Sequence, residues 1–82
     1  HSKIFVQIFK MGMDYQEEIR YISTRIKELR KERMLTVQEL AYRCDMERSN
    51  LSRIEAGRTN LTIRTMCIIC NALNVNLRDV IR

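Results

Sequence analysis

The chain has 82 residues, which is enough for one domain with a small core. Hydrophobic residues make up 45% of it, so global disorder is not expected, and the lack of proline together with only two glycines favours long helices over a turn-rich β-barrel. The formal net charge is +5, and eleven arginines outnumber four lysines. Because the guanidinium group matches phosphates and guanine edges, this balance favours a polyanionic partner, although composition alone is equally compatible with a soluble domain that has a positive surface.

The three cysteines are an odd number, so they cannot all form internal disulfides. The apolar start IFVQIF is short, is interrupted by Gln7 and precedes no small-residue cleavage site, so it does not predict a secretory signal. No run reaches the roughly eighteen apolar residues that a membrane span needs. We therefore expect free thiols in a reducing cytoplasm and no membrane partner.

The first 13 residues differ in pattern from the rest of the chain. In KIFVQIFKM the side chains alternate with a period of two, so Ile4, Val6 and Ile8 fall on one face of a predicted β-strand. A lone strand needs a partner edge, and a second copy of the chain is the simplest one. The pattern predicts an N-terminal extension, residues 1–13, that is used in dimerisation.

Parts of this extension could be foreign to the natural protein. His1 and Ser2 resemble the remainder of a cloning tag, and Met11 or Met13 is an alternative natural start. The domain itself is expected to occupy residues 14–82.

Helix signals begin at Asp14, which forms a D-x-x-E capping-box pattern with Glu17. Apolar residues then recur at spacings of three and four, which predicts a helix with one core-facing stripe. The stripe consists of Ile19, Ile22, Ile26 and Leu29. The basic residues of this helix, such as Arg20, Arg25 and Arg33, are expected mostly to form a solvated face, and contact with DNA is the alternative.

Thr36 and Glu39 form a second capping box and open a short helix. Its inward-facing residues are predicted to be Leu40, Ala41 and Cys44. Asp45 is expected to adopt a left-handed turn conformation after this helix. A third helix is predicted over about residues 48–56, with Gly57 as its left-handed terminator.

Two further helices complete the expected domain. Thr62 can cap a fourth helix, which is apolar on one side and ends at Asn74. Asn76 with Asp79 caps a last short helix. Five helices joined by turns of a few residues predict an all-α bundle with a small core.

Three motifs are more specific than the helix pattern: T-x-x-E-L-A at 36–41, L-S-R-I-E-A-G at 51–57 and A-L-N-V at 72–75. With these motifs, residues 25–81 resemble the helix-turn-helix domains of the phage repressor and Cro type, the XRE family. The resemblance implies a five-helix repressor-type bundle that binds double-stranded DNA, with the helix at 48–56 as the recognition helix in the major groove.

The resemblance also implies which residues meet the DNA bases. The base-facing positions of the recognition helix are Arg48, Ser49, Asn50 and Arg53. Their chemistry suits this role, because arginine offers two donors to guanine, asparagine offers a donor and an acceptor to adenine, and serine can bind either a base or a phosphate.

Phosphate contacts are implied on both sides of the recognition helix. The candidates are Gln38, Arg58, Asn60, Thr62 and Arg64. The start of the helix at Thr62 also offers free backbone N–H groups to an anion. Gln38 is the less direct candidate, because relatives commonly carry the phosphate-binding glutamine one position earlier, where this chain has Val37.

Two further positions depart from the family pattern, and a third, Glu55, agrees with it. Asp45 replaces the usual turn glycine, and Glu47 replaces the usual Ser or Thr cap, so we expect a weaker helix start and some loss of affinity. Glu55 is implied to form a largely buried ion pair with Arg30 of the first helix, which is a structural role.

Cys67 and Cys70 form a C-x-x-C pattern that invites a zinc or redox interpretation. Zinc needs four ligands, the only histidine is His1, and both cysteines lie in an apolar helical run, so we favour a role as core residues. No histidine base, carboxylate pair or phosphate-binding glycine loop predicts an enzyme. The sequence therefore predicts no metal, no cofactor and no small-molecule ligand.

The preferred hypothesis is a bacterial or phage transcriptional regulator that binds a palindromic operator as a homodimer. The alternative is a protein-interaction module, or an antitoxin or controller component whose main partner is another protein. Ile68 stands where relatives often carry an exposed lysine, so it joins Ile4, Val6 and Ile8 as a candidate for the dimer interface. The polarity of residues 48–53 favours DNA over a protein partner.

Overall fold

The structure, a computed structural model, describes residues 14–82. The predicted N-terminal strand, with its interface candidates Ile4, Val6 and Ile8, lies outside the described residues.

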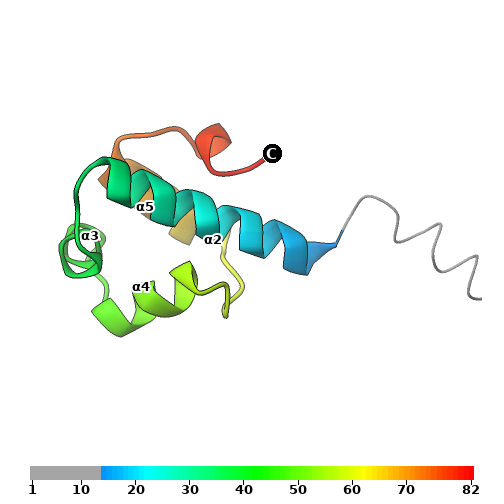
Figure 1. The fold of residues 1–82 in the computed structure, drawn as a ribbon, viewed down its shortest axis with the longest axis horizontal. Helices are drawn as coiled ribbons and strands as arrows, with labels where there is room; N and C mark the ends of the chain where they lie inside the picture. The colour runs from blue at the N-terminus through cyan, green and yellow to red at the C-terminus, as the bar shows by residue number, and fades with distance from the viewer. Residues whose placement is uncertain (1–13) are drawn as a thin grey trace, which may run out of the picture.

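Four α-helices and one short 3₁₀ turn make up the described part of the chain (Figure 1). They are α2 (Tyr15–Glu32), α3 (Val37–Arg43), α4 (Arg48–Glu55), α5 (Ile63–Leu73) and η1 (Leu77–Asp79). The long helix α2 packs against α4 and α5, while α3 packs against both α4 and α5. Figure 1 shows α4 and η1 on opposite sides of α2.

The starts of the helices follow the capping residues in the sequence. The Asp14 side chain accepts a hydrogen bond from the backbone N–H two residues later at 2.9 Å. Thr36 and Glu39 form a complete capping box, with bonds of 3.0 Å and 2.9 Å. Thr62 accepts from the N–H three residues later at 3.1 Å and so starts α5. These side chains satisfy backbone donors that the first turn of a helix leaves free.

A single apolar cluster lies where the four helices meet. Its largest fully buried side chains come from every element except η1 and include Val80, which directly follows η1. These side chains are Ile26, Leu40, Leu51, Ile69, Leu73 and Val80. The predicted stripe of α2 is confirmed at Ile26 and Leu29, whereas Ile22 is only half buried.

All four α-helices end in the same backbone motif. The left-handed residues are Met34, Asp45, Gly57 and Asn74, with φ between 54° and 72°. The residue after each of them donates its N–H to the carbonyl five positions earlier, at 3.0–3.1 Å. This is the Schellman arrangement, which satisfies carbonyls that the last helical turn leaves free. Three of the terminators match the prediction, but the sequence does not predict Met34, because methionine rarely adopts positive φ.

The prediction of a fifth α-helix after Asn76 is wrong. The segment forms only the three-residue turn η1, in which the N–H groups of Asp79 and Val80 bond to carbonyls three positions earlier, at 2.9 Å and 3.0 Å. The predicted cap is present, since the Asn76 N–H donates to Asp79 Oδ2 at 2.8 Å. Short 3₁₀ turns of this kind are frequent connectors. Here the turn directs Val80 into the core, where it is fully buried.

Within residues 14–82, every helix is too short or too polar to span a bilayer.

Candidate functional site

Helix α4 is anchored by two apolar side chains and exposes its polar side. Leu51 and Ile54 are 0% and 3% exposed, and they hold α4 against the rest of the core. The four residues predicted to meet DNA bases are all exposed to solvent. They are Arg48, Ser49, Asn50 and Arg53. The sequence therefore separates α4 into a narrow packing stripe and a broad polar face that is available to a partner.

The turn before α4 contains the residues that depart from the family pattern. Asp45 has φ 54°, the conformation expected of a turn glycine, and an asparagine or aspartate tolerates it better than most residues do. Met46 is half buried and packs against the core. Glu47 occupies the N-cap position without a side-chain hydrogen bond, as its weak capping ability predicts.

The five predicted phosphate contacts are also exposed. They are Gln38 on α3, Arg58 and Asn60 in the loop after α4, and Thr62 and Arg64 at the start of α5. The Thr62 hydroxyl is already engaged, because it accepts from the Thr65 N–H and donates to Thr65 Oγ1 at 3.0 Å. Thr62 is therefore available to an anion mainly through the backbone at the helix start.

Arg30 and Glu55 lie together, at the contact between α2 and α4. Arg30 Nε donates to Glu55 Oε2 at 2.7 Å, and Nη2 donates to Oε1 at 3.0 Å. The third guanidinium nitrogen, Nη1, donates to the Leu35 carbonyl at 2.8 Å. The two side chains are only 10% and 7% exposed. This bidentate pair fixes α4 against α2.

The C-x-x-C pair is divided between the core and the surface. Cys67 is exposed, whereas Cys70 is buried, and Cys44 at the end of α3 is buried too. Burial raises the pKa of the Cys44 thiol. Burial is also the main cause of the raised pKa of Cys70, with a smaller effect from Cys67. All three are free thiols, and residues 14–82 contain no group of three or more side chains arranged to hold a metal.

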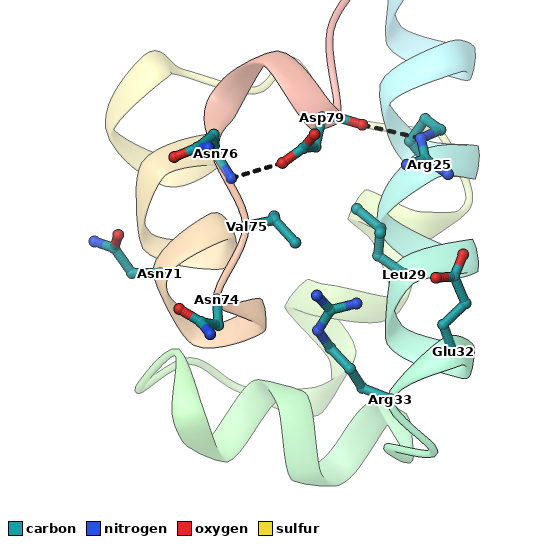
Figure 2. A pocket seen from close by; sticks show the side chains of 9 residues that line it. All are labelled: Arg25, Leu29, Glu32, Arg33, Asn71, Asn74, Val75, Asn76 and Asp79. Atoms are coloured by element: carbon teal, nitrogen blue, oxygen red, sulfur yellow. Dashed lines mark hydrogen bonds between the residues drawn. The ribbon is translucent and has the colours of Figure 1, made fainter.

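A second feature of the surface is a hollow of ≈ 630 Å³ between α2 and the connection from α5 to η1 (Figure 2). Arg25 on its edge donates from Nε to the Asp79 carbonyl at 2.9 Å and from Nη1 to Glu28 at 3.1 Å. The lining of this hollow has no net charge, because it contains two arginines, Arg25 and Arg33, and two carboxylates, Glu32 and Asp79. The bonds from Arg25 to the Asp79 carbonyl and from the Asn76 N–H to the Asp79 carboxylate show that this hollow lies where η1 attaches to α2.

Arg25 corrects one prediction from the sequence. The sequence predicts that it belongs to a solvated basic face, yet it is half buried and holds the backbone of η1 from 54 positions away. No local signal could have revealed this contact, because the Asp79 carbonyl is a backbone group that every sequence would supply.

The helices and motifs of the chain match a known family. A family model described as helix-turn-helix matches residues 26–80, which is more than half of the 82 residues. The chain belongs to the helix-turn-helix family. This match confirms the resemblance that the motifs at 36–41, 51–57 and 72–75 indicate.

Several helix-turn-helix proteins resemble the chain. The immunity repressor protein of Bacillus phage phi105 is 35% identical over 60 residues, which are 73% of this chain. The chain spans only 42% of the length of that repressor. The restriction-modification controller protein C.Esp1396I, solved as a tetramer in complex with its natural 35 base-pair operator, is 31% identical with a TM-score of 0.70, over 78% of this chain and 82% of the controller.

A second controller protein, C.AhdI from Aeromonas hydrophila, has a TM-score of 0.75 over 78% of this chain and 97% of its own. Its identity to this helix-turn-helix chain is 23%, so this likeness supports the fold alone.

Proposed function

We propose that this helix-turn-helix chain is a sequence-specific, double-stranded DNA-binding regulator of transcription, and that α4 is its recognition helix. The observation that carries the proposal is the exposed polar face of α4 above its anchors Leu51 and Ile54. Arginine and asparagine on such a face can make two hydrogen bonds to one base in the major groove, which discriminates by roughly 1–3 kcal/mol.

The charge around α4 supports a polyanionic partner. Residues 48–64 contain four arginines and one acidic residue, Glu55, so their formal charge is +4 − 1 = +3. The Glu55 carboxylate is buried against Arg30 and is neutralised there. The exposed surface of this segment therefore presents four arginine charges without a competing carboxylate from the same segment.

We further propose that the regulator acts as a homodimer on a palindromic operator, in a reducing cytoplasm where its thiols stay free. Helix-turn-helix dimers read half-sites about one helical turn apart, roughly 34 Å. The similar controller C.Esp1396I binds its operator as a tetramer, which supports oligomeric binding by this chain. Ile68, a proposed interface residue, is half buried against the core and leaves part of its side chain free for a partner.

A protein-binding function is less well supported by the same surface. Protein interfaces favour aromatic residues and methionine. The large exposed apolar side chains in the described region are dispersed over different elements, and none of them lies on α4. They are Tyr15, Met34, Tyr42, Ile63 and Ile81.

Selection of bound duplexes from a randomised pool tests the proposed function. The wild-type chain should enrich one half-site, present in two inverted copies. Arg48→Ala and Arg53→Ala should each weaken binding to the selected site by about 5- to 150-fold, and should relax the preference at the base that each contacts.

Arg78→Ala is the matched control, because it removes an arginine from η1, on the other side of α2 from α4. It should bind the selected site like the wild type apart from a small general loss of charge. A pool without an enriched half-site, or variants at 48 and 53 that behave like the control, would refute the assignment of α4.

A further inference from the structure

A groove of ≈ 400 Å³ lies between the start of α2 and the loop that follows α4. Its walls come from two parts of the chain that are far apart in sequence. The first wall contains Tyr15, Gln16, Ile19 and Arg20, and the second contains Gly57, Arg58, Thr59 and Asn60. The first wall precedes residue 26, where the match to the helix-turn-helix family begins. The match to the family model therefore covers only the second wall of the groove.

The two walls approach each other closely at Gly57. A methyl group added there would lie 3.8 Å from Arg20 Cγ and 3.8 Å from Ser23 Oγ, which is ordinary van der Waals contact. The aliphatic part of Arg20 thus lies along the loop backbone. Because Arg58 directly follows Gly57, the groove brings two arginines from separate elements to one place.

The lining of the groove carries a net charge of +2. Arg20 and Arg58 are its only ionic residues, and neither takes part in an ion pair within residues 14–82. Two other surface hollows differ. The one beside η1 has balanced charges, and the one lined by Arg43, Asp45 and Glu47 has a net charge of −1. An anion is the ligand class that fits the groove between Arg20 and Arg58.

The acidic residues at the start of α2 do not oppose this assignment. Glu18 precedes Arg20 by two positions and falls on the opposite side of a helix that turns about 100° per residue. Glu18 on that opposite side is engaged by Arg82, at 3.3 Å from both Nε and Nη2. Glu17 lies three positions before Arg20 and so beside it on the surface of α2, but the two side chains form no ion pair within residues 14–82, and Arg20 stays available to an anion.

We propose that this groove binds a backbone phosphate of the same DNA duplex, outside the bases that α4 reads, with Arg20 as its contact from α2. This inference rests on the proposed function of α4. Arg58 and Asn60 already belong to the predicted phosphate-binding loop, and the groove extends that loop onto α2. Tyr15 and Gln16 contribute further hydrogen-bonding groups to the same wall.

The test is the salt dependence of binding to the selected operator, with wild type, Arg20→Gln, Arg20→Lys and the matched control Arg78→Gln. Loss of one phosphate contact lowers the slope of log affinity against log salt by about 0.9. Arg20→Gln should show this loss, which amounts to roughly eight-fold over one decade of salt concentration. Arg20→Lys should retain the wild-type slope, and Arg78→Gln should change it much less.

Arg20→Gln should leave the ratio of specific to scrambled DNA affinity nearly unchanged, because phosphates carry no base information. Neutral methylphosphonate linkages, placed singly along the operator, should weaken wild-type binding at one flanking position where Arg20→Gln is insensitive. Circular dichroism melting would establish that the variant is folded.

The inference is overturned if Arg20→Gln binds like Arg78→Gln while Arg48→Ala and Arg53→Ala still lose the operator, a result that leaves the proposed function intact. Loss of base preference in Arg20→Gln would also overturn it. Failure of the wild type to select any operator would instead refute the proposed function of α4.

Discussion

Arg30 and Glu55 join the long helix α2 to α4 through two parallel hydrogen bonds of 2.7 Å and 3.0 Å. The Leu35 carbonyl accepts a further bond from Arg30, so the buried guanidinium is well satisfied. The pair lies at the contact between α2, the longest helix, and α4, the helix with the proposed site. Its geometry therefore controls how α4 is presented to a partner.

Glu55→Ala should destabilise the fold by about 3–5 kcal/mol, because it leaves the Arg30 charge buried without its partner. The double variant Arg30→Met with Glu55→Leu should be more stable than Glu55→Ala, since it removes both buried charges. Urea unfolding measures both effects. Glu28→Ala is the control, because Glu28 pairs with Arg25 at the surface and such pairs contribute at most about 1 kcal/mol. Equal midpoints for Glu55→Ala and Glu28→Ala would contradict a stabilising role of the pair.

Met34→Gly should stabilise the fold by up to about 1 kcal/mol. Met34 has φ 55°, which costs a residue with a Cβ atom roughly 1–2 kcal/mol. Glycine avoids this cost but loses more chain entropy on folding, so the net gain is smaller. Little packing is lost, because the side chain is 88% exposed. Thermal melting checks the gain. Met34→Ala has the same backbone restriction and should show no comparable increase, so equal melting temperatures of the Gly and Ala variants would count against backbone strain.

The capping box of α3 should make stability depend on pH through Glu39. Hydrogen bonds from the Thr36 backbone N–H and then the Thr36 side chain hold the pKa of Glu39 below its usual value of 4.5. A pKa that is lower in the folded state means that the unfolded chain binds the proton first on acidification, so this contribution is complete above the unfolded pKa and is lost as pH falls through the folded one.

Glu39→Gln removes that titration while it keeps a side chain that can cap the helix. Its free energy of unfolding should fall less than that of the wild type as the pH is lowered from about 5 to below the folded pKa. Denaturant unfolding at several pH values measures the difference. Parallel pH profiles for the two proteins would rule out this role for Glu39.

A single cysteine should react quickly with a thiol reagent in the folded protein. Cys67 is exposed, whereas Cys44 and Cys70 are buried and have a raised pKa, so both their access and their thiolate fraction are reduced. At about pH 8, near the ordinary pKa of a thiol, we expect one fast thiol and two that react only after unfolding in denaturant. Cys67→Ser should abolish the fast phase, and three thiols of equal rate would be inconsistent with this arrangement of the core.

Much of the candidate site could be predicted because its signals are local. The caps at Thr36 and Thr62 act within one turn of their own helix, and Leu51 and Ile54 mark the packing stripe of α4 by spacing alone. The exposed face of α4 then follows, because the residues on the other sides of this short helix cannot also point to the core. The prediction of a fifth helix was wrong because capping residues specify where a helical segment starts but not how many turns follow.

The amino-acid sequence was sufficient to predict where the helices begin, which side of each faces the core, and the family to which the chain belongs, since all of these depend on residues within a few positions of one another. Three other features required the folded structure: Arg25 holds the backbone of η1, Arg20 and Arg58 line one groove, and α2 ends on Met34 with positive φ. These features depend on packing between distant segments, whose free energy can override a local preference and which no spacing along the chain encodes.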